Sequence, residues 1–140
     1  MDDMNRRSAM ALGLTVAAAA PLVALASPAA AAMYGPEAGK EILPGIREVD
    51  LGEWPAKIGT YAKVKVQDYI SAPGTHFPED KMANDMICQI LEGAFKVARG
   101  GETFVADTGH TFACAKGALE EDWNEGNVDA VMRVINLLPA

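Results

Sequence analysis

Apolar and polar side chains alternate clearly through residues 61–70. One face of this segment carries Ala62, Val64, Val66 and Ile70, and the other carries Lys63, Lys65 and Gln67. A period of two is typical of a half-buried β-strand. The sequence Ser-Ala-Pro-Gly at 71–74 contains a turn dipeptide, so we expect the strand to end there.

Shorter apolar runs continue this pattern towards the C-terminus. Further strands are expected at residues 86–91, 94–98, 103–106, 111–115 and 128–138. Gly100-Gly101 predicts a tight hairpin, because both glycines accept positive φ. Residues 116–127 are expected to form a loop. Short strands at roughly ten-residue spacing are typical of an all-β sandwich or barrel.

Two segments leave alternatives open. Residues 128–138 carry Val, Ile and Leu on both faces, which indicates a strand buried on both sides. Val131, Val134, Ile135 and Leu138 also fit a helical stripe over 129–138, but the β-branched content favours a strand. Residues 34–57 are acidic and punctuated by Gly and Pro. We expect residues 33–57 to form an arm around a barrel domain at 58–140.

The first 32 residues have the composition of an export signal. Arg6 and Arg7 precede an Ala-rich apolar run at 9–26, and small residues suited to signal peptidase end at Ala32. We expect cleavage after Ala32 and a periplasmic or secreted protein. The arginine pair resembles a twin-arginine (Tat) signal. The alternative is an uncleaved membrane anchor, because about 18 apolar residues can just span a bilayer.

The net charge and the two cysteines exclude several classes of function. The net charge is −7, and an acidic surface repels phosphate backbones, so we expect no nucleic-acid partner. Cys88 and Cys114 lack Cys-x-x-Cys spacing, which excludes a zinc knuckle or a thioredoxin-type motif. They are either two buried thiols on adjacent strands or, in an exported protein, one disulfide.

The spacing of glycines resembles the two sequence motifs of the cupin family. The first motif runs from Gly74 to Gly93, and the second runs from Gly109 through Gly117 to Asn124, both without a gap. The resemblance covers residues 64–139. It implies an all-β chain with a single cupin-type jelly-roll barrel, preceded by the N-terminal signal segment. The family's habit of pairing barrels by edge strands implies a homodimer.

The residues at the family's metal positions differ from the family pattern. Where metal-dependent cupins carry His, His, Glu and His, this chain has Asp80, Met82, Met86 and Glu120. Two carboxylates and two thioethers suit iron or manganese poorly, and thioethers would select cuprous copper or simply fill a core. We therefore expect no metal and no cofactor. His76 and His110 are either turn residues or, for His76, part of the site near Asp80.

These features together indicate an exported cupin-domain protein that binds a small molecule in a diverged, metal-free pocket. The expected ligand-binding residues are Asp80, Met82, Met86, Glu120 and His76. If Asp80 and Glu120 face inward, they could bind a cation or polyol, or transfer a proton. The alternative is a metal-dependent cupin enzyme of dioxygenase or isomerase type with non-standard ligands. An uncleaved signal would instead indicate a structural partner of a membrane complex.

Overall fold

The computed structural model describes residues 32–140, and the folded unit runs from Tyr34 to Ala140. Residues 1–31, which make up all but the last residue of the expected signal segment, lie outside the described residues. Within residues 32–140, no helix is long and apolar enough to cross a membrane. The described chain consists of ten β-strands: β1 (Lys40–Leu43), β2 (Ile46–Ile58), β3 (Tyr61–Ser71), β4 (His76–Lys81), β5 (Asp85–Glu92), β6 (Ala94–Arg99), β7 (Glu102–Asp107), β8 (Thr111–Cys114), β9 (Leu119–Trp123) and β10 (Ala130–Pro139).

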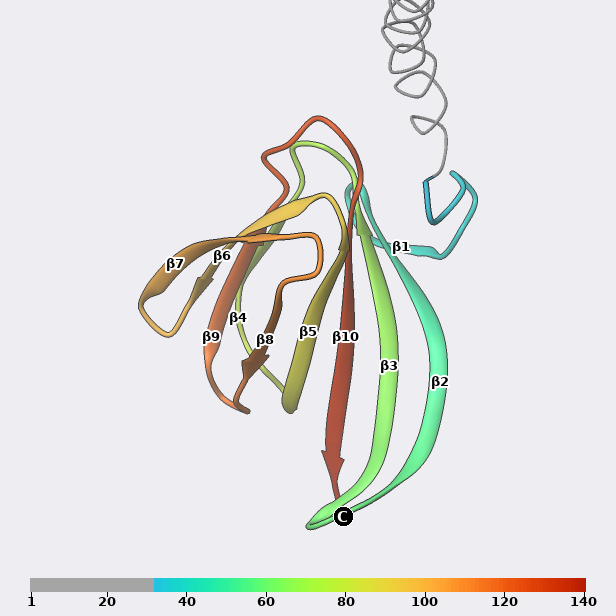
Figure 1. Cartoon of the computed structure of the whole chain (residues 1–140), viewed down its shortest axis with the longest axis vertical. Helices are drawn as coiled ribbons and strands as arrows, with labels where there is room; N and C mark the ends of the chain where they lie inside the picture. The colour runs from blue at the N-terminus through green and yellow to red at the C-terminus, as the bar shows by residue number, and fades with distance from the viewer. Residues whose placement is uncertain (1–31) are drawn as a thin grey trace, which may run out of the picture. The chain divides into compact units, whose positions relative to one another are not determined.

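The strands form two antiparallel sheets (Figure 1). The larger sheet has the order β1-β2-β3-β10-β5-β8, and the smaller one has the order β4-β9-β6-β7. Side chains of both sheets share one core, which contains Ile90, Phe95, Val97, Phe112 and Met132 among others. The all-β jelly-roll class expected from the sequence is confirmed.

The strand interpretation of the C-terminal run is confirmed, and its helical alternative is wrong. β10 lies between β3 and β5 and pairs with both (Figure 1). Its burial follows from this central place, because Val131, Met132 and Val134 are all buried although neighbouring side chains point to opposite faces. The expected burial on both sides is only partly met, because Arg133, Ile135 and Leu137 on the other face are half-buried.

The segment 116–127 is not a continuous loop, because β9 occupies Leu119–Trp123. Its inward positions are Glu120 and Asp122, so the strand has no apolar alternation that could mark it. Residues 33–57, expected to be an arm, contain β1 and most of β2. β2 pairs with β3 along most of its length, so the larger sheet begins before position 58.

The two faces of β3 differ from the simple apolar-in, polar-out pattern. Gln67, placed on the expected polar face, lines an internal cavity together with Tyr69. On the opposite face, Asp68 is fully buried and bonds Arg133 and Tyr34. Polar residues are therefore buried on both sides of this strand, because each finds a hydrogen-bond partner there.

The glycine and asparagine residues of the two motifs lie in the connections between strands. Gly93 separates β5 from β6 with φ of 65°, and a Cβ at this position would lie 3.1 Å from the Ala130 backbone. Asn124, which is buried, donates to the carbonyl oxygens of Ser71 and Val128 and accepts from the Gly126 amide. Asn124 therefore holds the turn that follows β9 and ties the end of β9 to β3.

Candidate functional site

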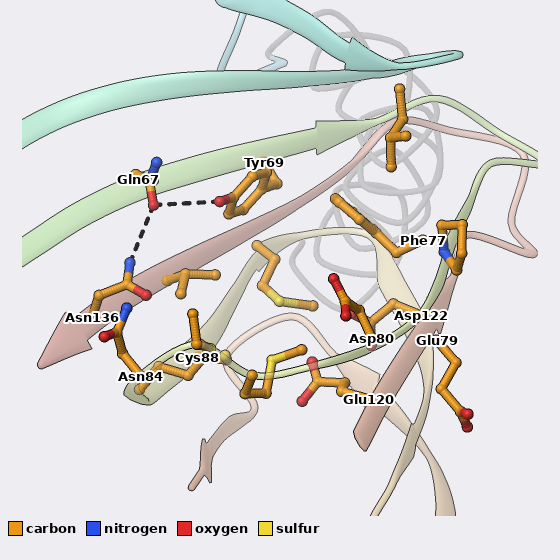
Figure 2. A pocket seen from close by; sticks show the side chains of 17 residues that line it. Gln67, Tyr69, Phe77, Glu79, Asp80, Asn84, Cys88, Glu120, Asp122 and Asn136 are labelled. Carbon is orange, nitrogen blue, oxygen red and sulfur yellow. Dashed lines mark hydrogen bonds between the residues drawn. The ribbon is translucent and has the colours of Figure 1, made fainter. Parts of the chain in front are cut away.

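A cavity of about 550 Å³ lies between the two sheets (Figure 2). Its wall is built from strands of both sheets, namely β3, β5 and β10 on one side and β4 and β9 on the other. The lining residues are Leu43, Gln67, Tyr69, Phe77, Pro78, Glu79, Asp80, Met82, Ala83, Asn84, Met86, Cys88, Glu120, Asp122, Met132, Val134 and Asn136.

Four of the five sequence-predicted site residues line this cavity, namely Asp80, Met82, Met86 and Glu120. They differ in burial: Glu120 is 5% exposed, whereas Asp80 is exposed and its Oδ1 accepts from the Lys81 amide at 2.8 Å. Asp80 therefore lies at the cavity rim and Glu120 lies inside.

His76 is not among the cavity-lining residues. Its ring stacks on Trp123 with centroids 5.1 Å apart, and its Nε2 lies 3.4 Å from Glu121 Oε1. His110, the other histidine, stacks on Phe104 at 5.6 Å and does not line the cavity either. Both histidines are exposed, but His76 begins strand β4 and does not lie in a turn.

A second buried carboxyl group, on Asp122, was not identified from the sequence. Asp122 follows Glu120 by two residues on β9, so both side chains face the cavity. Asp122 is 8% exposed, and its Oδ1 has no hydrogen-bond partner within the described residues. Burial and, secondarily, the charge of Glu120 raise the pKa of Asp122 to about 9. At neutral pH this carboxyl group is protonated.

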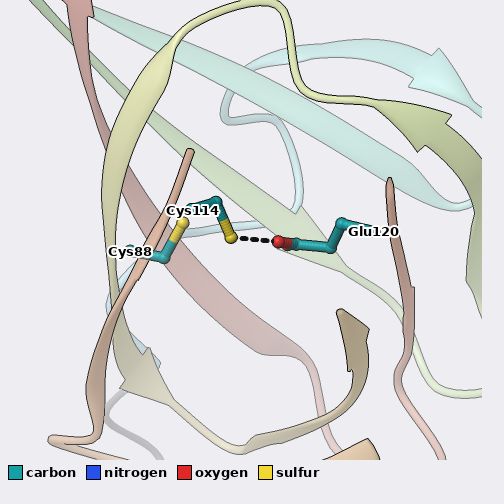
Figure 3. A group of neighbouring side chains, drawn as sticks. All are labelled: Cys88, Cys114 and Glu120. Carbon is teal, nitrogen blue, oxygen red and sulfur yellow. Dashed lines mark hydrogen bonds between the residues drawn. The ribbon is translucent and has the colours of Figure 1, made fainter. Parts of the chain in front are cut away.

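Two buried thiols lie beside the Glu120 carboxyl group (Figure 3). Cys88 on β5 and Cys114 on β8 are 1% and 3% exposed, and both are free thiols. The Cys114 thiol donates a hydrogen bond to the Glu120 carboxylate. The hydrogen bond with Cys114, and then burial, raise the pKa of the Cys88 thiol. The prediction of buried thiols on adjacent strands is confirmed.

The part of the wall formed by β3, β10 and the start of β4 combines aromatic rings with neutral polar groups. Gln67 Oε1 accepts hydrogen bonds from Tyr69 Oη at 3.3 Å and from Asn136 Nδ2 at 3.1 Å (Figure 2). Tyr69 meets Phe77 edge to face, with centroids 5.6 Å apart. Burial raises the pKa of Tyr69, so its hydroxyl stays protonated. This wall can contact an apolar ligand body and offer neutral hydrogen-bonding groups.

The charge of the cavity wall has one sign. The carboxyl groups of Glu79, Asp80 and Glu120 line it together with the protonated Asp122, and no lysine, arginine or histidine lies among the lining residues. Such a wall attracts a cation and repels an anion, more strongly in a partly enclosed site than in water.

The residues at the family's metal positions do not fit iron or manganese. Met82 and Met86 offer only soft, uncharged thioethers, and Asp80 is exposed at the rim. Glu120 is the single buried oxygen donor of the four, while iron and manganese sites need several oxygen or imidazole ligands.

Comparisons with known proteins extend the fold assignment. No family model and no curated protein matches the chain. A solved RmlC-like cupin from Shewanella frigidimarina matches with a TM-score of 0.60 and 15% identity, covering 76% of this chain and 88% of that one. KdgF from Halomonas sp. matches with a TM-score of 0.59 and 16% identity, covering 70% and 84%. A predicted oxalate decarboxylase from Thermotoga maritima matches with a TM-score of 0.55 and 21% identity, covering 66% and 81%.

These identities are low, so the likeness concerns the fold. It agrees with the two antiparallel sheets, with the glycine-centred strand connections, and with a cavity between the sheets that is lined by residues of both sequence motifs. The chain therefore has the cupin fold.

Proposed function

We propose that this is an exported small-molecule-binding protein of the cupin fold, and that its ligand has an apolar body and a cationic end. The observation that carries this proposal is the wall of the cavity, where buried carboxyl groups face aromatic and aliphatic side chains and no basic side chain lines the space. An apolar cavity with a few converging polar groups is the usual anatomy of a small-molecule site.

The two ends of the ligand have separate partners. Glu120 is the buried carboxylate best placed to meet an ammonium group, because charge-assisted hydrogen bonds are stronger than neutral ones. Tyr69 and Phe77 present ring faces and edges to the apolar body, and a cation near such rings gains further attraction. A volume of about 550 Å³ accommodates a molecule of roughly drug-like or metabolite size.

A series of probes that differ in charge tests the proposal. We expect metal-stripped protein to bind 2-phenylethylamine more tightly than neutral 2-phenylethanol, and 3-phenylpropanoate least tightly, as measured by calorimetry. Glu120→Gln should weaken amine binding about tenfold, because one charge-assisted hydrogen bond is replaced by a neutral one. Tightest binding of the anion, or an unchanged amine affinity in the variant, contradicts the proposal.

Glu121→Gln is the matched control for that variant. Glu121 neighbours Glu120 on β9 but interacts with His76 outside the cavity. The Glu121→Gln substitution removes the same charge from the same strand, so a long-range electrostatic effect would appear in both variants. A loss of amine affinity confined to Glu120→Gln assigns the effect to the cavity.

Export is tested on the full chain expressed in a bacterium that has a twin-arginine pathway. We expect the mature protein to begin close to Met33 and to be found outside the cytoplasm. Replacing Arg6 and Arg7 together by lysine should stop export, because the twin-arginine route depends on that pair. Cell fractionation and N-terminal sequencing measure both outcomes. Unchanged export of the variant would assign the general secretory route, and retention of the wild-type chain would contradict export.

A further inference from the structure

Three buried donor groups from three strands converge at the inner end of the cavity. The Cys88 and Cys114 sulfurs and a Glu120 carboxylate oxygen all lie within 4.8 Å of one another (Figure 3). Cys88 and Cys114 belong to the larger sheet and Glu120 belongs to the smaller one. The cluster therefore joins the two sheets through side chains that can all become anionic.

The connection between β8 and β9 holds two of these donors in place. Residues 115–118 make a turn in which the Ala118 amide donates to the Ala115 carbonyl at 3.0 Å. The same turn is tied to the loop after β4, because the Gly117 amide donates to the Met82 carbonyl and the Met82 amide donates to the Ala118 carbonyl, each at 2.8 Å. Cys114 and Glu120 thus flank a well-bonded turn, which fixes their separation before any ligand binds.

We propose that Cys88, Cys114 and Glu120 form a zinc site. Zinc accepts thiolate and carboxylate ligands together, at about 2.3 Å for sulfur and about 2.0–2.2 Å for oxygen in a tetrahedral arrangement. Donor atoms around such an ion lie within 4 Å of one another, roughly, which small side-chain movements reach from the observed spread. Zinc binding releases two protons to solvent, the one that lies between the Cys114 sulfur and Glu120 and the one on the Cys88 thiol.

The set of donor atoms favours zinc over iron, manganese and cuprous copper. Iron and manganese favour oxygen and imidazole, and cuprous copper favours sulfur alone. A mixed set of two thiols and one carboxylate suits the borderline-soft zinc ion. Neither cysteine occupies a metal position of the cupin motifs, so the residues at the motif positions gave no indication of a zinc site.

Asp122 supplies a second, independent observation at the same place. Its carboxyl group is more than nine-tenths buried, lines the cavity two residues from Glu120, and leaves Oδ1 without a partner within the described residues. Asp122 lies outside the convergent set of three, so we assign it to the outer shell, orienting the Glu120 carboxylate. Cys88 and Glu120 both line the cavity, which gives space for a fourth ligand.

The strand register favours a shared metal ion over a disulfide between Cys88 and Cys114. Cys88 lies opposite Phe112, and Cys114 lies opposite Met86, so the two cysteines are diagonal neighbours across β5 and β8. Diagonal positions on neighbouring strands are roughly 7–8 Å apart, beyond the usual span of about 4.4–6.8 Å between the Cα atoms of a disulfide. The diagonal placement suits a shared ion better than a shared covalent bond.

The zinc site goes beyond the proposed function and is compatible with it. Two thiolates and one carboxylate around Zn²⁺ leave one net negative charge, so the cavity wall still favours a cationic ligand end. Amine binding is measured on metal-stripped protein, so a failure of zinc binding and a failure of ligand binding are separate results.

The test is metal binding by the full chain, purified under reducing conditions without chelator. We expect mass spectrometry of the metals to give about one zinc per chain, with iron and manganese far below one. After stripping, titration of zinc against a chromophoric chelator measures affinity. Cys88→Ser and Cys114→Ser should each weaken zinc binding by roughly 100-fold or more, because each removes one ligand of the ion. Cobalt substitution should give a thiolate-to-cobalt charge-transfer band that both variants lose.

Met86→Leu is the control, because Met86 lines the cavity beside Cys114 but lies outside the convergent set. Its zinc affinity should stay within about twofold of the wild type, since no ligand is lost. Folded, reduced protein that binds no zinc overturns the proposal. So does zinc binding that survives both serine substitutions, or stoichiometric cuprous copper that Met86→Leu removes. Circular dichroism of each variant separates loss of the site from loss of the fold.

Discussion

Arg133→Met should lower the free energy of unfolding by about 2–4 kcal/mol, because it leaves a buried carboxylate without its cationic partner. Asp68 is 0% exposed, and it accepts from Arg133 Nε and Nη2 at 2.9 Å each. Tyr34 Oη donates to the same carboxylate at 2.5 Å but carries no charge. The effect lies below that of a fully buried pair because about a third of the Arg133 side chain is exposed. Urea denaturation at neutral pH measures it.

Two further variants test the cause of that loss. Lys63→Met breaks the ion pair of Lys63 with Glu53, whose charged atoms are 3.6 Å apart and solvent-exposed, and it should cost less than about 1 kcal/mol. Adding Asp68→Asn to Arg133→Met should recover part of the stability, because the buried group is then neutral. Equal effects of Arg133→Met and Lys63→Met would show that burial of Asp68 does not matter.

The sequence was sufficient to predict the strands that carry mostly apolar residues. β10 lies inside the larger sheet and is apolar except for Arg133 and Asn136, and the Gly100-Gly101 hairpin has positive φ at both residues as expected. The paired motif glycines were informative for a similar reason, since each stands where the chain turns between strands. In these places local conformation and tertiary environment demand the same residue types.

β9 was missed because its environment is unusual. Its inward side chains are carboxyl groups that face a cavity rather than a hydrocarbon core, so the run of charged residues looked like a solvated loop. The sequence shows no period of two here, because Glu121 between Glu120 and Asp122 is acidic as well. Hydrophobic patterning cannot detect a strand whose buried face is polar.

The sequence predicted one part of the candidate site and missed another. Motif spacing pointed to Asp80, Met82, Met86 and Glu120, all of which line the cavity. It gave no place to Cys88 and Cys114, because their proximity depends on the pairing of β5 with β8, 26 residues apart along the chain at the cysteines. His76 precedes Asp80 closely in sequence, but it stacks on Trp123 outside the cavity.

Asp122→Asn should stabilise the metal-free protein, and the gain should grow with pH. The pKa of Asp122 is about 9 in the folded chain, above its ordinary value of 3.8. Stability from this group is therefore fully present below about pH 4 and is lost as pH rises towards 9, because the unfolded chain ionises first. Asparagine has nearly the same shape and never ionises, so the variant avoids this loss. We expect a gain of about 1–3 kcal/mol near pH 8, because each unit of pKa difference is worth roughly 1.4 kcal/mol and the cost of burying the asparagine amide offsets part of it.

Urea denaturation at several pH values, with chelator present, measures the difference between Asp122→Asn and the wild type. The two curves should approach each other near pH 4 and separate steadily above it. Asp107→Asn, at the exposed end of β7, removes a carboxyl group that water already solvates, and its difference from the wild type should stay within about 0.5 kcal/mol. A variant that is destabilised at every pH would show that the Asp122 carboxyl group is well satisfied in the fold. A constant gain without pH dependence would show that the buried group does not titrate, and that its effect comes from packing alone.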